Sequence, residues 1–186
     1  MKTEIEARLL DINEEEFTEL MCRFDAKFVG DWIMSRNVYD FNPIDDGKWI
    51  RLRTNGIETT LAIKEIENDS IEGTKETEIV VSDFDSTNEI LNKLGYFARG
   101  SQTNRRIRYI LDDVEIDIDF WPMIPTYVEF EADSKDKIFR LCKKLDIDFN
   151  ALTTMSVPEV YLHYGIDVRM CPKINILETE RANKKY

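Results

Sequence analysis

Hydrophobic and polar positions alternate with a period of two along most of this chain. Side chains of a β-strand point alternately to the two faces of a sheet, so this period predicts strands. Two tight turns, Asn55-Gly56 and Asp112-Asp113, join neighbouring segments as hairpins. We predict strands, or extended segments, at residues 2–10, 27–33, 34–41, 48–54, 57–66, 74–82, 103–111, 114–120 and 126–132.

Helices interrupt the strands at four places, where the apolar period lengthens to that of an α-helix. Asn13 followed by Glu16 resembles a capping box, and Gly95 is a typical residue just after a helix end. The chain has no internal repeat, low-complexity tract or linker, which predicts a single domain over residues 1–186. The fold class is α+β, dominated by antiparallel sheet. The predicted helices span residues 14–24, 85–94, 134–145 and 157–164.

Charged side chains recur on one face of seven predicted strands, and apolar side chains occupy the opposite face. One explanation is a solvated outer face, because antiparallel sheets commonly bury one side only. The alternative is a closed antiparallel barrel of about eight strands that forms a charged tunnel, with amphipathic helices packed outside. Pairs of acidic residues or of arginines at alternate positions of one strand favour the barrel, because a solvated face normally also carries Thr, Ser, Gln and Lys. The charged residues are Glu4, Glu6, Arg8, Arg51, Arg53, Lys64, Glu76, Glu78, Arg106, Arg108, Asp117, Asp119, Glu129 and Glu131.

So many charges inside a narrow barrel require ligands that complete the charge balance, because an unpaired buried charge is very unfavourable. Guanidinium groups bind phosphate through two parallel hydrogen bonds, which suits a polyphosphate. Clustered carboxylates suit Mg²⁺ or Mn²⁺, which prefer oxygen ligands. The pattern therefore predicts a site for a triphosphate and divalent metal.

Net charge, hydropathy and cysteine content limit the partners that this protein is expected to bind. A net charge of −12 disfavours nucleic acid, whose phosphates it repels, and no apolar stretch approaches the length of a membrane span. Three cysteines without CxxC spacing indicate reduced thiols and a cytoplasmic location. The single histidine, His163, excludes most histidine-centred catalysis, and we expect it to be packed on its helix. A homodimer is compatible with the sequence.

At this point the motifs resemble a known family. Glu4-Ile5-Glu6-Ala7-Arg8 is similar to the ExExK signature of CYTH domains, the triphosphate tunnel metalloenzymes, which include class IV adenylate cyclases, thiamine triphosphatases and inorganic triphosphatases. The resemblance covers roughly residues 3–132 and continues into the C-terminal helices. The motifs that follow in the family's order are Arg51-Leu52-Arg53, Ala62-Ile63-Lys64, Glu76-Thr77-Glu78, Arg106-Ile107-Arg108, and Asp119 with Glu129-Phe130-Glu131.

The resemblance implies roles for the charged residues. Glu76 and Glu78 would hold a second metal or orient the basic residues. Glu4, Glu6, Arg8 and Lys64 would be the catalytic residues. The metal ligands would be drawn from Glu4, Glu6, Asp117, Asp119, Glu129 and Glu131, and the triphosphate clamp would consist of Arg8, Arg51, Arg53, Lys64, Arg106 and Arg108.

Two positions depart from the family pattern. Arg8 replaces the signature lysine, and Pro125 stands where many members have glycine. Arginine keeps the positive charge but changes its shape, so we expect an active but slow enzyme that Arg8→Lys accelerates. We expect residues 121–125 to form a rigid loop near the tunnel mouth, held by packing.

Three functions fit these residues. The favoured hypothesis is a metal-dependent triphosphatase acting on inorganic triphosphate, a nucleoside triphosphate or thiamine triphosphate. The first alternative is a class IV-type adenylate cyclase that makes cyclic AMP from ATP. The second is a protein that binds polyphosphate or nucleotide without turnover. The same tunnel could serve each of them, so the fold does not choose.

Overall fold

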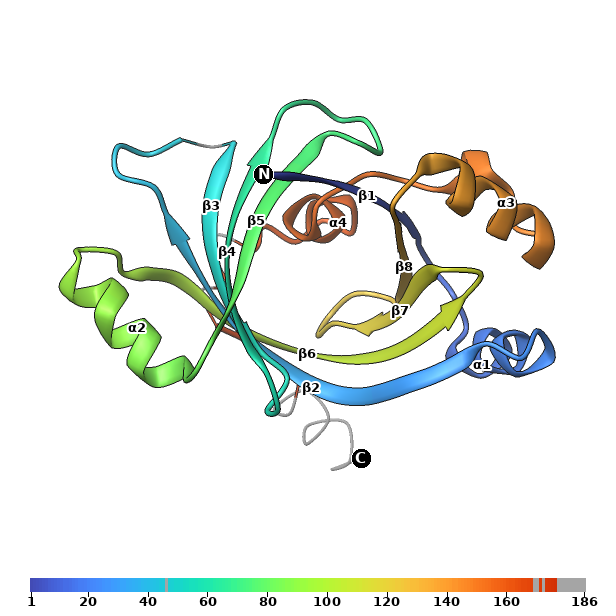
Figure 1. Cartoon of the computed structure of the whole chain (residues 1–186), viewed down its shortest axis with the longest axis horizontal. Coiled ribbons are helices and arrows are strands. Elements are labelled where there is room, and N and C mark those ends of the chain that lie inside the picture. Colours follow the sequence, from blue (N-terminus) through green and yellow to red (C-terminus); the bar gives the residue numbers. More distant parts are fainter. Residues whose placement is uncertain (46, 169–170, 172, 177–186) are drawn as a thin grey trace.

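The strands form one sheet that closes on itself (Figure 1). The computed structural model describes residues 1–45, 47–168, 171 and 173–176, so the end of the predicted domain lies outside the described residues. The strand order is β2-β3-β4-β5-β1-β8-β7-β6-β9, and an additional pairing of β2 with β6 closes the first eight strands into an antiparallel barrel. The strands are β1 (Lys2–Leu9), β2 (Lys27–Asp40), β3 (Lys48–Thr54), β4 (Thr59–Ile66), β5 (Thr74–Val81), β6 (Ala98–Leu111), β7 (Val114–Phe120), β8 (Tyr127–Ala132) and β9 (Lys173–Asn175).

The helices form where caps and amphipathic faces predict them, which together with the barrel confirms the α+β prediction. The Asn13 side chain accepts a hydrogen bond from the Glu16 backbone N–H at 3.0 Å and begins the first helix. Asp112 and Asp113 adopt positive φ angles of 52° and 59°, as the tight turn between β6 and β7 requires. The helices are α1 (Glu14–Arg23), α2 (Phe84–Lys93), α3 (Lys135–Leu145) and α4 (Val157–His163), with a short 3₁₀ turn at Phe149–Ala151.

The apolar outer face of the barrel makes the hydrophobic cores. Ile118 and Phe130 on the outside of β7 and β8 are fully buried against Met21 of α1 and Leu141 of α3. On the other side, Leu91 of α2 packs with apolar residues of β2 and β3. The hydrophobic cores between helices and strands therefore lie outside the barrel.

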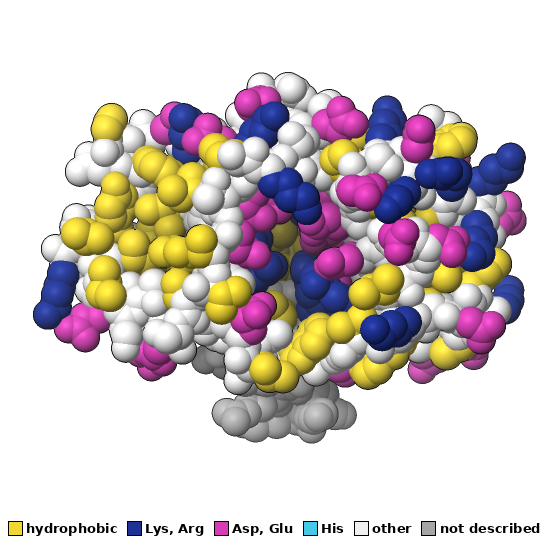
Figure 2. Space-filling model, in the orientation of Figure 1, with side chains coloured by type: hydrophobic (Ala, Val, Ile, Leu, Met, Phe, Trp, Pro, Cys, Tyr) yellow, Lys and Arg dark blue, Asp and Glu magenta, His cyan; other side chains and the backbone are white. Residues whose placement is uncertain are grey.

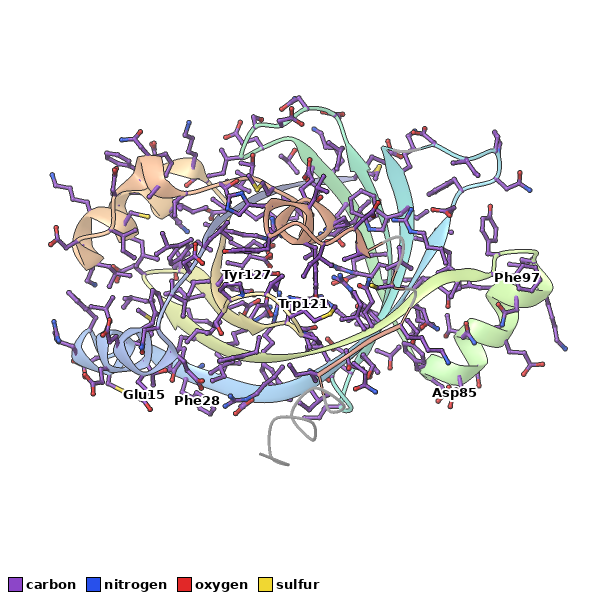
Figure 3. All side chains as sticks on the ribbon, turned by 180° about the vertical axis from the view of Figure 1, so that it is seen from behind. Glu15, Phe28, Asp85, Phe97, Trp121 and Tyr127 are labelled. Carbon is purple, nitrogen blue, oxygen red and sulfur yellow. The ribbon has the colours of Figure 1, made fainter. Side chains whose placement is uncertain are left out.

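Helix α4 covers one end of the barrel, and it lies within the barrel outline in Figure 1. Tyr161 donates a hydrogen bond to the Pro122 carbonyl at 2.8 Å, and its ring meets the Trp121 ring edge-on at 6.3 Å. Seen from behind, Trp121 and Tyr127 lie together near this helix (Figure 3). Residues 121–125 are thus held by packing, as expected, but they stand at the covered end.

Some boundaries differ from the predictions. The segments predicted at 27–33 and 34–41 form one strand, β2, because it pairs along its whole length with β6. β6 begins at Ala98 instead of residue 103, and β9 was not predicted. His163 is exposed at the end of α4, so the expectation that it is packed was wrong. No helix in the described part of the chain is long and apolar enough to cross a membrane.

Candidate functional site

The strand registers place all the predicted charged residues on one face of the barrel, its inner face. Residues directly opposed in an antiparallel pair share a face. Arg8 opposes Glu129, Glu129 opposes Asp117, and Asp117 opposes Arg108, which carries the pattern across β1, β8, β7 and β6. The same parity continues through the other strands. Figure 2 shows the result as a hollow at the centre of the molecule, lined by basic and acidic side chains.

One wall of this lumen is densely ion-paired. Arg106 donates to Asp117 at 2.5 Å, to Asp119 at 2.8 Å and to Glu129 at 3.2 Å. Asp119 has no exposed surface and also accepts from Asn104 at 2.9 Å. Because Arg106 lies on β6 and its carboxylate partners lie on β7 and β8, it ties three strands together. We call the set Arg8, Arg106, Arg108, Asp117, Asp119 and Glu129 the paired wall.

Arg8 extends the paired wall to the C-terminal segment. Its guanidinium donates to the Met155 carbonyl at 2.7 Å, to Glu6 at 3.1 Å and to Glu129 at 2.5 Å. The backbones of Arg8 and Thr153 also pair as an isolated β-bridge. Arg8 therefore connects the first strand to the segment that leads into α4, a role that needs several donors in fixed directions.

The charges of the paired wall stabilise one another. Burial disfavours the ionised forms, but Asp117, Asp119 and Glu129 raise the pKa of Arg106 well above its usual value. Burial likewise opposes ionisation of Glu129, yet Arg8 and Arg106 lower its pKa below the usual range. Arg106 and Glu129 therefore remain charged near neutral pH, whereas burial raises the pKa of Asp119 to about 6.

A second group of ion pairs lies on β3, β4, β5 and β1. Arg51 donates to Glu76 at 2.9 Å and to Glu78 at 3.0 Å. The Lys64 ammonium lies 2.7 Å from a Glu4 carboxylate oxygen. Burial, followed by the neighbouring Glu4, raises the pKa of Glu76 to about 8. This part of the lumen is balanced less completely than the paired wall.

Two arginines on β2 and β3 have little compensation. Arg36 and Arg53 oppose each other across the strands, and we call them the unpaired arginines. Arg53 has its nearest carboxylate, Glu78, at 3.6 Å. Among the described residues Arg36 has no carboxylate partner; it donates to Gln102 at 2.8 Å and stacks 4.4 Å above the centre of the Trp121 ring. Repulsion by Arg51 and then burial lower the pKa of Arg53 to about 10, and burial lowers that of Arg36 to about 10.

The opposite imbalance occurs at Glu131 on β8. It directly opposes Glu6 of β1 on one side and Glu115 of β7 on the other, and it has no ion pair within the described part of the chain. Burial and then the neighbouring carboxylates Glu129 and Glu4 raise the pKa of Glu131 to about 7. Like charges directly opposed across strands are unfavourable, so this position is an excess of negative charge.

The chemistry of these carboxylates fits a hard divalent cation, which prefers oxygen ligands and would remove the repulsion between Glu131 and Glu6. In the described residues, however, no three carboxylate, histidine or cysteine side chains lie close enough to hold a metal ion. Of the six predicted metal ligands, Asp117, Asp119 and Glu129 are already bonded to arginines of the paired wall. Glu4 and Glu6 are also paired, with Lys64 and Arg8, so Glu131 is the one predicted ligand without an ion pair among the described residues.

A cavity of about 90 Å³ lies between the arginines and the β3–β4 hairpin. A water molecule needs about 10–15 Å³ measured in this way, so several water-sized groups fit. It is lined by the basic side chains of Arg53, Arg106 and Arg108 and by the apolar side chains of Trp32 and Met34.

The sequence did not indicate Arg36 or Trp32 as lumen residues. The inner face of β2 carries Trp32, Met34, Arg36 and Val38, as their pairings with β6 and β3 show. Because three of these four are apolar, the rule of charged-inside alternation does not mark this strand. If the strand is predicted to run unbroken from residue 27 to 40, Arg36 and Trp32 fall on the same face. That shared face was the available signal.

Comparison with known proteins gives one family match and several structural ones. The model of the CYTH domain matches residues 2–148. A protein of Pyrococcus horikoshii is 21% identical with a TM-score of 0.73, covering 84% of this chain and 98% of its own. A candidate adenylate cyclase of Vibrio parahaemolyticus is 16% identical with a TM-score of 0.70, covering 87% of this chain and 98% of its own.

A third similar structure is a candidate adenylyl cyclase of Hippeastrum with a dominant triphosphatase activity. It is 15% identical with a TM-score of 0.58, and the match covers 89% of this chain and 96% of that one. No curated protein sequence matches the chain. At these identities the structural likenesses show a shared fold.

Proposed function

Because this chain belongs to the CYTH domain family, we propose that it is an enzyme that binds a linear triphosphate with a divalent cation in its lumen and hydrolyses it. One observation carries the proposal: the lumen has two separate charge imbalances of opposite sign. Among the described residues, Arg36 has no carboxylate partner, Arg53 has none nearer than 3.6 Å, and Glu131 has no cation partner. A metal–triphosphate complex corrects both at once.

The triphosphate would bind along the basic side of the lumen. Arg53, Arg106 and Arg108 border the cavity, and guanidinium groups match phosphate oxygens with paired donors. Arg36 supplies a further cation from the neighbouring strand β2. The phosphate oxygens would relieve the repulsion that lowers the pKa of Arg53.

The carboxylates Glu4, Glu6 and Glu131 would hold Mg²⁺ or Mn²⁺ on the opposite side. When bound, such an ion neutralises charge on phosphate oxygens and makes a coordinated water more acidic. Lys64 remains within 2.7 Å of Glu4 and would keep this carboxylate in place. The paired wall would orient its arginines in advance, because Asp117, Asp119 and Glu129 fix the direction of Arg106.

In hydrolysis, the oxygen of water forms a bond to the terminal phosphorus, and the bond from that phosphorus to the bridging oxygen breaks. The bridging oxygen stays on the remaining diphosphate, and the proton that the water loses passes to solvent. Negative charge grows on the leaving bridging oxygen and on the transferred phosphoryl group. Arginines that are already aligned stabilise this charge without reorganising, and this accounts for most of what catalysis at phosphorus requires.

The test is a substrate panel with inorganic triphosphate, ATP and thiamine triphosphate, each with Mg²⁺ or Mn²⁺. We expect metal-dependent release of phosphate that EDTA abolishes, and loss of turnover in Arg53→Gln. Arg105→Gln is the matched control, because Arg105 neighbours Arg106 but binds Asp31 and Glu14 outside the lumen. Activity that survives EDTA would contradict the proposal.

The same panel separates the alternatives. An adenylate cyclase would convert ATP to cyclic AMP and pyrophosphate and would leave inorganic triphosphate intact. A binding protein would hold triphosphate with metal and release no product. Phosphate release from inorganic triphosphate would exclude both as the main activity.

A further inference from the structure

The outer face of the barrel is well covered by helices on one side and left partly bare on the other. α1 and α3 bury the outer residues of β7 and β8 completely, as at Ile118 and Phe130. Across β3, β4 and β5, exposure instead increases with distance from α2. Leu52 of β3 is fully buried, Leu61 opposite it on β4 is partly buried, and Ile79 opposite Leu61 on β5 is 56% exposed. Helix α2 therefore covers β3 and leaves the apolar outer face of β5 open.

Exposed apolar residues of α2 and of the turn that follows it extend this bare area. Leu91 of α2 packs into the core, whereas Ile90 and Leu94 are exposed. Phe97 has 71% of its surface exposed and lies on the turn after α2 in Figure 3. Figure 2 shows apolar side chains gathered on the left, over α2 and the strands beside it. We call the following residues the apolar flank: Ile63, Ile79, Ile90, Leu94 and Phe97.

The apolar flank is as large as the largest apolar patch of a typical monomer, and such patches commonly mark interaction sites. Its five side chains are exposed by 36–71%. Together they present on the order of 500 Å², against about 800 Å² that each partner buries in a standard interface. The polar residues around the flank supply the remainder. This area suits a dimer of moderate affinity, with a dissociation constant on the order of 10 µM.

Ion pairs border the apolar flank, although the whole chain carries a net charge of −12. On α2, Glu89 and Lys93 form an ion pair at 3.0 Å, and both side chains are exposed. On the outer face of β3 and β4, Lys48 pairs with Glu65 at 3.2 Å. A strongly charged partner gains little from a surface whose charges are balanced in this way. A second copy of this acidic chain, in contrast, meets little repulsion there.

Glu89 and Lys93 also make α2 complementary to itself. In a dimer with a two-fold axis the same surface meets itself, so residue i of one copy contacts residue j of the other, and j contacts i. When two α2 helices lie antiparallel, Glu89 of each copy faces Lys93 of the other. The ion pair within each helix is then exchanged for two ion pairs between the helices, beside the apolar contact.

We propose that the apolar flank is the contact surface of a homodimer, related by a two-fold axis that passes beside α2. Packing the two flanks together removes Ile79, Leu94 and Phe97 from water, which is the main favourable contribution to association. The ion pairs at the rim set the relative orientation of the two copies. The contact lies on the outer face of the barrel, so the proposal is independent of the function proposed for the lumen.

Sedimentation velocity of the full chain, over a range of protein concentrations, measures the dissociation constant of the dimer. Leu94→Glu should weaken the dimer at least about 100-fold, because it places a carboxylate inside the apolar contact. Leu162→Glu is the matched control: Leu162 lies on α4, outside the apolar flank, and its exposure of 60% is close to the 68% of Leu94. This control should leave the dimer unchanged. Thermal unfolding checks that every variant folds.

Charge exchange on α2 tests the two-fold arrangement. Glu89→Lys alone and Lys93→Glu alone each place like charges opposite each other across the contact, and each should weaken the dimer about tenfold. The double variant restores opposite charges and should return the dissociation constant to within about twofold of the wild-type value.

Three outcomes would overturn the proposal. The first is a wild type that sediments as a monomer at about 100 µM, ten times the expected dissociation constant. The second is a dimer that Leu94→Glu leaves intact, or that Leu162→Glu weakens equally. The third is a double charge variant that dimerises no more tightly than the single variants.

Discussion

The paired wall and the unpaired arginines present similar guanidinium groups in opposite circumstances. Arg106 contacts three carboxylates within 3.2 Å, whereas Arg36 contacts none among the described residues and Arg53 has its nearest at 3.6 Å. Their pKa values follow: that of Arg106 rises well above the usual value, and those of Arg36 and Arg53 fall to about 10. Residue type and strand parity are the same in both places.

The difference shows that identical side chains in one charged lumen can have two roles, one in stability and one in ligand binding. A buried ion pair is costly to break, since the remaining partner is left without compensation. The paired wall therefore holds the barrel in shape. Unpaired like charges raise the energy of the empty site, and an anion that binds between them recovers that energy. Under the proposed function, the unpaired arginines would therefore bind the anion.

The largest expected effect is on stability. Arg106→Gln should lower the free energy of unfolding by about 3–5 kcal/mol, because Asp117, Asp119 and Glu129 would remain buried without their shared cation. Arg53→Gln should leave it unchanged or raise it, since the substitution removes repulsion from Arg51. Urea denaturation of the three proteins measures this difference.

The outer-face variant Arg105→Gln controls for loss of an arginine on β6, and its exposed ion pairs should contribute about 0–1 kcal/mol. Equal destabilisation by Arg106→Gln and Arg53→Gln would show that the two groups of arginines contribute alike to stability.

The second prediction concerns triphosphate affinity. Arg36→Gln and Arg53→Gln should each weaken binding about 10- to 100-fold, equivalent to about 1.4–2.8 kcal/mol, while the unfolding midpoint without ligand stays near the wild-type value. The measurement is the rise in the midpoint on adding inorganic triphosphate with Mg²⁺, which should shrink in both variants. A full rise in Arg36→Gln would remove this residue from the site.

The third prediction revises the expectation for Arg8. Lysine cannot reach the Met155 carbonyl, Glu6 and Glu129 together, as the guanidinium does. We now expect Arg8→Lys to lower the free energy of unfolding by about 1–2 kcal/mol, because two charge-assisted hydrogen bonds are lost. Urea denaturation and the rate on inorganic triphosphate test this together. An accelerated, fully stable variant would support the original expectation.

The smallest effect is a pH dependence at Glu131, whose pKa rises in the folded protein to about 7 from a usual value of 4.5. The folded state then binds more protons than the unfolded state between these values, so stability falls as pH rises through this range and the loss is complete above pH 7. In EDTA, Glu131→Gln should be more stable than wild type at pH 8, by on the order of 1 kcal/mol, and equal to it below about pH 4. Thermal unfolding at the two pH values measures it, and identical differences at both would contradict the assignment.

Much of the fold was predictable from the alternation of side chains between the two faces of each strand. Doubled charges such as Arg51 with Arg53 and Glu129 with Glu131 alternate with apolar residues, and the registers put these charges on the inner face. The Asn13 cap and the Asp112-Asp113 turn follow from local backbone chemistry, which neighbouring residues decide. Such features are predictable because they depend on short stretches of chain.

Which charged side chains form ion pairs with one another was not predictable from the sequence, because it depends on which strands become neighbours. Nothing near Arg106 in the sequence distinguishes it from Arg53, and the difference arises because β6 lies beside the acidic β7 while β3 lies beside β2 and β4. Arg36 was missed because its strand is mostly apolar inside. The covering of one barrel end by α4 depends on contacts such as Tyr161 with Pro122, which are remote in sequence.

The position of β1 in the barrel has a consequence for how the chain folds. This first strand lies between β5 and β8, and its Arg8 also pairs with Thr153. Its contacts with β8 and with the segment before α4 join residues that are 121 and 147 positions apart in the sequence. Contacts so distant in sequence slow folding, because a long loop must be ordered before they form. The pairing of β1 with β8 therefore closes a loop that contains most of the chain, and Arg8 meets Glu129 only when that loop has formed.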